Sequence, residues 1–168
     1  MELTKQQLDK QHYPVLSFLD DLKISYQLFE HPPVFTVDEA KNLLAHILGH
    51  GTKNLFVRDK KKTTYALYTV REEVRVDLKT LGNQIGLGNV SFASPDDLRA
   101  KLHVEPGSVT PLAMLYADLL VLCYFDKTLL EFDLIQIHPM INTATIVLNP
   151  KDFCHGLLEK KGVMVRVI

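Results

Sequence analysis

The sequence is poor in cysteine, in long hydrophobic runs and in net charge, and each shortage excludes a class of protein. Cys123 and Cys154 lie far apart in the chain and fit neither a disulfide framework nor the spacing of a zinc site. The first residues are polar and no run of roughly eighteen apolar residues occurs, so we expect no signal peptide, no membrane span and a cytoplasmic location. The formal net charge of -1 gives no overall basic field, so any contact with nucleic acid needs a local patch.

Motifs for phosphate, dinucleotide and metal binding are also missing. The chain contains neither G-x-x-x-x-G-K-[ST] nor G-x-G-x-x-G. His46 and His50 have the i, i+4 spacing of zinc ligands on a helix, but no glutamate follows His46 and Gly49 interrupts the segment. Ser108 and Thr110 have no evident base and acid partners, so a serine-type triad is not supported. We therefore expect no cofactor and no metal.

The length and the hydrophobic pattern predict one mixed α/β domain, residues 1–168. A chain of 168 residues with 46% hydrophobic content fits a single core. Strand-like runs occur at 26–29, 55–57, 63–70, 90–92, 119–125, 134–138, 143–148 and 163–168. Helix starts are predicted at Thr4, Pro14, Thr36, Asp77, Ser94 and Asn149. Because strands outnumber helices and both are interspersed, we expect a mixed sheet covered by helices.

Local capping signals predict where several of these helices begin and end. Thr4 with Gln7, and Thr36 with Glu39, have the spacing of capping boxes. The helix that begins at Thr36 is expected to end at Gly49 or Gly51, and the last helix at Gly162, because glycine adopts the left-handed conformation that commonly follows a helix.

Basic residues cluster around the first predicted hairpin. Lys53 stands at the mouth of a strand, where its ammonium is either held toward a phosphate or solvated. Arg58, Lys60 and Lys61 belong to a charged turn at 58–62. Lysines in such turns commonly serve solubility and protect strand edges, and the alternative is contact with a nucleic-acid backbone. The spacing leaves both interpretations open.

Two irregular segments place polar groups where a ligand can reach them. The loop 106–111 (PGSVTP) supplies several backbone N–H groups, and Gly107 lets a ligand approach the main chain, which suits a nest for a carbonyl or an oxyanion. An ordinary surface connection is the alternative. The turn from His138 to Thr143 combines an imidazole, an amide and a hydroxyl, although such residues also form purely structural turns.

Four segments in the same order resemble those of the free-standing prolyl-tRNA editing proteins: 31–36 (HPPVFT), 53–56 (KNLF), 107–111 (GSVTP) and 138–145 (HPMINTAT). These proteins belong to the YbaK/prolyl-tRNA-synthetase-associated domain superfamily, and the similarity covers nearly the whole chain. The resemblance implies a central mixed, partly barrel-like β-sheet surrounded by helices. It also implies hydrolysis of an aminoacyl ester at the 3′ end of tRNA, without a metal or a covalent intermediate. The closest subgroup acts on alanyl-tRNA(Pro), and other relatives act on cysteinyl-, seryl- or threonyl-tRNA.

The resemblance further implies roles for individual residues and partners. The expected catalytic residues are Lys53, Gly107 and His138. The expected substrate-binding residues are Val34, Thr36, Asn54, Ser108, Val109, Thr110, Pro111, Met140, Asn142 and Thr143. The expected tRNA contacts are Arg58, Lys60 and Lys61. The implied partners are mischarged tRNA, above all tRNA(Pro), with prolyl-tRNA synthetase or an elongation factor as further candidates.

The chemistry of an aminoacyl ester is consistent with such a site. The ester is already activated, so water attacks once the carbonyl is held and its developing charge meets preorganised donors. The terminal ribose hydroxyl of the substrate is expected to help orient that water. A pocket built for proline rejects a smaller amino acid by only about 1–3 kcal/mol, so a second, smaller pocket must admit alanine and exclude proline. The alternatives are a deacylase for another amino acid, a non-catalytic module that binds tRNA or a synthetase, and a protein whose motif residues are all structural.

Overall fold

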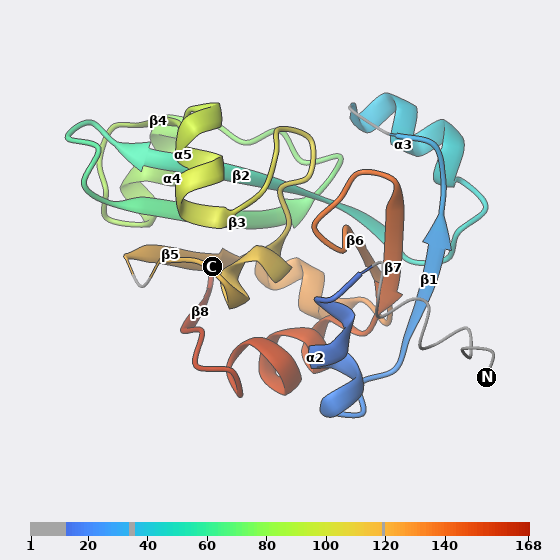
Figure 1. The fold of residues 1–168 in the computed structure, drawn as a ribbon. Coiled ribbons are helices and arrows are strands. Elements are labelled where there is room, and N and C mark those ends of the chain that lie inside the picture. Colours follow the sequence, from blue (N-terminus) through green and yellow to red (C-terminus); the bar gives the residue numbers. More distant parts are fainter. Residues whose placement is uncertain (1–12, 34–35, 119) are drawn as a thin grey trace.

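The computed structural model of the chain describes residues 13–33, 36–118 and 120–168 (Figure 1). The expected capping box at Thr4 and Gln7 and the candidate substrate residue Val34 lie outside this part of the chain. Within it, the strands form an eight-stranded mixed sheet, as the sequence predicted. They are β1 (Tyr26–Glu30), β2 (His50–Asp59), β3 (Tyr65–Arg71), β4 (Val90–Phe92), β5 (Val121–Phe125), β6 (Ile135–Ile137), β7 (Ala144–Leu148) and β8 (Val165–Val167).

The sheet runs in the order β1-β7-β6-β2-β3-β5-β8, with β4 paired to the far end of β2. The β2–β3, β2–β4, β6–β7 and β1–β7 pairs are antiparallel, and the β2–β6, β3–β5 and β5–β8 pairs are parallel. Strands β1 and β8 lie at opposite ends of this order, so the sheet is not closed. The expected barrel-like character is therefore wrong for the described strands.

The β2–β3 hairpin corrects two expectations about its boundaries. Strand β2 begins at His50 instead of residue 55, because His50 and Gly51 pair with β6, which is distant in sequence. Arg58 lies inside β2 opposite Tyr65, so the turn is shorter than 58–62 suggested. The Asp59 carboxylate closes that turn by accepting the backbone N–H groups of the threonines that follow it at 2.8 and 3.0 Å.

The helices follow the predicted capping signals closely. They are α2 (Leu16–Asp21), α3 (Val37–Leu44), α4 (Leu78–Gln84), α5 (Pro95–Leu102) and the shorter or irregular η1 (Pro111–Leu115), η2 (Lys127–Glu131) and η3 (Asp152–Leu158). Thr36 and Glu39 form the expected capping box, and Ser94 with Asp97 forms another. The Asp77 side chain caps α4. No helix in the described ranges is long and apolar enough to cross a membrane.

Two helices end earlier than their glycines suggested. Helix α3 ends at Leu44, because Ile47 turns back to donate its N–H to the Leu44 carbonyl. Gly49 then adopts a φ of 96° just before β2 starts. Helix η3 is a π-helix that ends at Leu158, and Gly162, at φ 86°, belongs to the turn after it. In both cases the glycine redirects the chain toward the next strand.

The main hydrophobic core lies between the sheet and α2, α5, η1 and η3. Figure 1 shows α2 and the C-terminal helix η3 together on one side of the sheet. Leu16 and Leu19 of α2, Phe153 of η3 and the sheet residue Phe125 are fully buried in this core. A second cluster packs α4 on β2 and β3, and a small third cluster packs Leu44 of α3 near β7.

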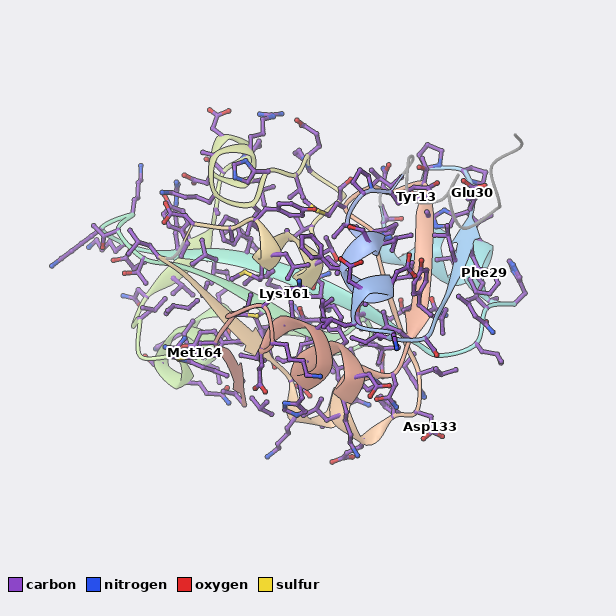
Figure 2. The ribbon with its side chains drawn as sticks, turned by 60° about the horizontal axis from the view of Figure 1, so that its bottom comes forward. Tyr13, Phe29, Glu30, Asp133, Lys161 and Met164 are labelled. Carbon is purple, nitrogen blue, oxygen red and sulfur yellow. The ribbon has the colours of Figure 1, made fainter. Side chains whose placement is uncertain are left out.

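A side-chain hydrogen bond ties the segment before α2 to the edge of the sheet. The Tyr13 hydroxyl donates to the Glu30 carboxylate at 2.8 Å, and Figure 2 shows the two residues beside each other. Tyr13 is itself buried in the main core. This contact fixes the start of the described chain against β1.

Both cysteines are free, buried thiols in the main core. Burial raises the pKa of the Cys123 thiol to about 12 and raises the pKa of Cys154 further. The thiolate is the reactive form, so we expect negligible labelling by a thiol reagent in the native protein at pH 8 and full labelling in denaturant. Rapid labelling of the native protein would contradict this packing.

Candidate active site

The site lies where β2 and β6 separate. The two strands pair in parallel only at His50 with Ile135 and at Gly51 with Gln136. Just beyond, the Thr52 hydroxyl donates to the Gln136 carbonyl at 2.7 Å, and the ladder ends. The gap that opens between the strands is bridged by the loop 106–111.

Side chains on both sides of the gap clamp this loop. The Asn54 amide donates to the Val109 carbonyl at 3.0 Å, while the Asn54 carbonyl oxygen accepts the Thr69 hydroxyl at 2.7 Å. On the other side, the fully buried Thr110 hydroxyl donates to the His138 carbonyl at 2.7 Å. Asn54 thus holds the loop to β2, and Thr110 holds it to the end of β6. This role for Asn54 was not foreseen from the sequence.

The clamped loop has backbone donors for which no described residue is an acceptor. Gly107 has a φ of 88°, a conformation that favours glycine. Among the residues the structure describes, the N–H of Ser108 donates to the Glu105 carbonyl, whereas those of Gly107, Val109 and Thr110 have no acceptor. Free N–H groups close together on a fixed loop can form a nest for a carbonyl oxygen or an anion. Pro111, which begins η1, and the buried Ser108 complete the loop without contributing a free donor.

His138 is oriented by the turn that follows it. Its Nδ1–H donates to the Ala144 carbonyl at 3.1 Å, so in the neutral ring Nε2 is an acceptor. Burial lowers the pKa of His138, and the nearby His31 lowers it further, although the Ala144 carbonyl acts in the opposite direction. His31 is held in turn by Thr145, whose hydroxyl lies 3.0 Å from His31 Nε2. The neutral imidazole is therefore the favoured form.

This lowered pKa gives a testable pH dependence. The imidazole of His138 should titrate below its ordinary value of 6.5, as followed by NMR with His138→Asn for assignment. Because the unfolded chain binds this proton at a higher pH than the folded one, the contribution to stability is present above 6.5 and decreases as pH falls below it. A midpoint above 6.5 would contradict the burial of the ring.

A cavity of about 30 Å³ lies beside His138, large enough for a water molecule or a similarly small group. Its walls come from the beginning of β2, the end of β3, β6, β7 and α3. They are Leu44, Gly51, Thr52, Glu72, Gln136, Ile137, His138 and Thr145. Its polar side chains are Thr52, Glu72, Gln136, His138 and Thr145, and Leu44 and Ile137 are apolar.

Lys53 points away from the loop and is not among the residues that line this cavity. Side chains alternate along a strand, so Lys53 shares a face with Gly51 and lies opposite in direction to Asn54. Lys53 is half-buried, and within the described residues its ammonium forms no ion pair. A half-buried ammonium without a carboxylate is suited to an anionic ligand.

The remaining predicted site residues lie outside this cluster. Arg58 pairs with the Asp97 carboxylate, whose pKa is lowered to about 2 by its hydrogen bonds from Ser94 and Tyr65 and by Arg58, against the opposing effect of burial. Lys60 and Lys61 are exposed in the hairpin turn, and Thr36 is the exposed N-cap of α3.

The turn after His138 also borders a second, separate pocket. Met140, at φ 68°, lines a separate apolar pocket of about 420 Å³ together with Tyr13 and Tyr116. Asn142 and Thr143 are half-buried, and the Thr143 carbonyl accepts the His31 N–H at 3.0 Å. The structure therefore brings Asn54, the loop and His138 together. It directs Lys53 to the opposite face of β2 and leaves Met140 on the far side of the turn.

Sequence reasoning missed several residues that line the cavity. Thr52, Glu72, Gln136 and Thr145 carry no motif, and only their nonlocal pairing brings them together. His31 belongs to a segment that carried the family resemblance, but its contact with Thr145 requires the β1–β7 pairing. A cue for Glu72 existed only in its position at the end of a predicted strand.

Fold and site together place a loop with unused main-chain N–H groups between β2 and the end of β6, hydrogen-bonded to His138, which lines a small cavity. The model of the aminoacyl-tRNA editing domain matches residues 31–154. The prolyl-tRNA editing protein ProX of Acetoanaerobium sticklandii is 38% identical over 139 residues, which cover 82% of this chain and 85% of ProX. Prolyl-tRNA synthetase associated domain-containing protein 1 of Mus musculus is 40% identical over 139 residues, covering 80% and 82%.

A solved structure shares the fold. A protein described as a candidate trans-editing enzyme for prolyl tRNA synthetase superposes with a TM-score of 0.68 at 21% identity, covering 99% of this chain and 98% of that one. The chain belongs to the aminoacyl-tRNA editing domain family. Editing is the hydrolysis of a wrongly formed aminoacyl-tRNA ester, so the expected class of enzyme, an aminoacyl-tRNA deacylase, is confirmed.

Proposed function

We propose that the chain removes alanine from mischarged tRNA(Pro) as a free-standing enzyme. The observation that carries this proposal is the clamped loop, whose N–H groups at Gly107, Val109 and Thr110 have no acceptor among the described residues. The loop is hydrogen-bonded to His138, which lines a cavity of about 30 Å³. A pocket of this size suits a methyl side chain and excludes a pyrrolidine ring. ProX, with 38% identity to this chain, bears the name of a prolyl-tRNA editing protein, which supports tRNA(Pro) as the substrate.

The proposed mechanism is attack of water on the ester carbonyl. The loop N–H groups stabilise the oxyanion as it forms, and they are held in place before the reaction by Asn54 and Thr110. Water adds to the carbonyl carbon, the oxyanion collapses, the ester bond to the ribose oxygen breaks, and the proton from water passes to that oxygen. The neighbouring ribose hydroxyl orients the water. Nε2 of neutral His138 accepts a hydrogen bond from a ribose hydroxyl and so positions it.

Lys53 supplies positive charge on the β2 side of the site. Its half-buried ammonium is proposed to hold the terminal phosphate of the tRNA. That contact would fix the ester relative to the loop, so Lys53 contributes to orientation as well as to affinity. The substrate implied by this assignment is mischarged tRNA(Pro). Prolyl-tRNA synthetase and an elongation factor, which also bind this tRNA, are the further candidate partners.

A serine or cysteine substrate is the second candidate, and the polar lining of the cavity favours it. Thr52, Gln136 and Thr145 could accept a side-chain hydroxyl that an alanine methyl lacks. The test is the rate of deacylation of tRNA(Pro) charged with alanine, serine, cysteine and proline. Fast release of alanine alone supports the proposal, and preferential release of serine or cysteine replaces it. No release of any of the four amino acids supports a binding module instead.

The hairpin turn is proposed to contact the acceptor stem of the tRNA. We expect Lys60→Ala with Lys61→Ala to weaken tRNA binding and to reduce its salt dependence without lowering the free energy of unfolding, because both side chains are exposed. Arg58→Ala should differ, since it removes the partner of Asp97 and destabilises the fold. Filter binding at several salt concentrations and urea unfolding measure these effects. Unchanged affinity and unchanged tRNA(Pro) preference in the double variant would rule out the turn as a contact.

A further inference from the structure

The carboxylate of Glu72 occupies a position that a side chain on β2 would otherwise fill. Glu72 follows the end of β3, where its N–H donates to the Gly51 carbonyl at 3.0 Å. A Cβ atom built on Gly51 would lie 2.2 Å from Glu72 Oε2 and 2.7 Å from Oε1. The carboxylate therefore lies directly over Gly51, and it also lines the cavity beside His138.

Glu72 and Lys53 approach the site from the same face of the β2–β3 hairpin. Thr52 pairs with Arg71 and Lys53 with Val70, so Gly51 faces Glu72 and Lys53 lies diagonally from it. Diagonal neighbours in an antiparallel pair have Cα atoms roughly 7–8 Å apart, within reach of long side chains. No ion pair joins Lys53 to a described carboxylate. A cationic side chain thus lies diagonally across the hairpin from a carboxylate that borders the cavity.

We propose that Glu72 binds the α-ammonium group of the aminoacyl ester, an inference that rests on the proposed function. The substrate carries two charged groups near the scissile bond: the phosphate, which Lys53 suits, and the α-ammonium, which requires a carboxylate. The other polar side chains on the cavity wall, Thr52, Gln136 and Thr145, carry no negative charge. Glu72 is the carboxylate at this wall, within the part of the chain that the structure describes.

This contact would do more than increase affinity. A neighbouring carboxylate favours the protonated form of an amine, so Glu72 keeps the substrate as the ammonium ester. The positive charge next to the ester withdraws electrons from the carbonyl carbon and makes it more susceptible to water. Gly51 allows the Glu72 carboxylate to reach the cavity, because any larger side chain at position 51 would displace that carboxylate.

The experiment compares alanyl-tRNA(Pro) with lactyl-tRNA(Pro), which has a hydroxyl in place of the ammonium and is otherwise the same size. Single-turnover rates are measured for the wild type, Glu72→Gln and Gly51→Ala, with Glu73→Gln as the matched control on the adjacent residue. Because charged hydrogen bonds contribute substantially, Glu72→Gln should slow alanine release by about 10- to 100-fold and leave lactate release nearly unchanged. Gly51→Ala should show the same selective loss, and Glu73→Gln should show none.

The ratio of the two rates is internal to each variant, so partial unfolding cancels from it. An equal loss on both substrates, or no loss on either, overturns the role of Glu72 while leaving the proposed function intact. A wild-type protein that releases neither alanine nor lactate contradicts the proposed function itself. The two failures are therefore distinguishable in one set of measurements.

Discussion

Replacing Lys53 by alanine is expected to slow deacylation of alanyl-tRNA(Pro) by on the order of 100-fold, the scale of losing one preorganised charged contact at an active site. Lys53 is half-buried on β2 and forms no ion pair within the described residues. Its removal leaves no unpaired carboxylate behind, so the free energy of unfolding should change little. Single-turnover kinetics with enzyme in excess separates the loss of rate from a loss of affinity.

The matched control is Lys79→Ala, which removes the same charge from an exposed position on α4. Lys53→Arg should recover part of the rate, because it keeps the charge but changes the geometry. If Lys53→Ala binds tRNA more weakly but cleaves bound substrate at the wild-type rate, Lys53 is only a binding residue. Equal losses in Lys53→Ala and Lys79→Ala would indicate general electrostatic attraction.

Replacing Asn54 by alanine is expected to have an effect of similar size through position alone. The Asn54 amide holds the Val109 carbonyl and accepts the Thr69 hydroxyl, so the variant frees one side of the loop 106–111. A displacement of about 1 Å at an active site can cost roughly 100-fold in rate. The variant also leaves a hydrogen-bonding group of the loop without its partner, which should lower the free energy of unfolding by about 1–3 kcal/mol.

Thr69→Val is the comparison that separates these effects. It removes the hydroxyl that orients Asn54 but leaves the contact between Asn54 and Val109. We expect a smaller loss of rate than in Asn54→Ala, with a comparable loss of stability because Thr69 is fully buried. If Asn54→Ala retains full activity in its folded fraction, the loop does not depend on the clamp, and the proposed oxyanion nest loses its main support.

Features set by nearby residues were predictable from the sequence. The capping box of Thr36 and Glu39 and the cap at Asp77 depend on side chains three residues from the N–H groups they bind. The nearly continuous run of apolar and aromatic residues in 65–71 likewise marks a strand wherever it pairs. These signals placed most helices and strands within a few residues.

Features set by pairing between residues distant in the sequence were not predictable from it. Strand β2 begins at His50 because β6 lies beside it, and nothing in 50–54 signals that contact. Arg58 is engaged by Asp97 from a helix nearly forty residues later, so its charge is not free for tRNA as the turn suggested. Glu72 reaches the site only through the register of the hairpin. Motif reading predicted Lys53, Gly107 and His138 as site residues, but finding the residues of the cavity wall required the fold.

The central claim is that the loop 106–111 holds the ester carbonyl during hydrolysis. The most direct measurement is a crystal structure with an alanyl-adenosine analogue in which an amide replaces the scissile ester. The account predicts that the carbonyl oxygen lies about 2.7–3.1 Å from free loop N–H groups, with the methyl in the cavity beside His138. An analogue bound in the apolar pocket near Met140, with the loop N–H groups facing solvent, would contradict it.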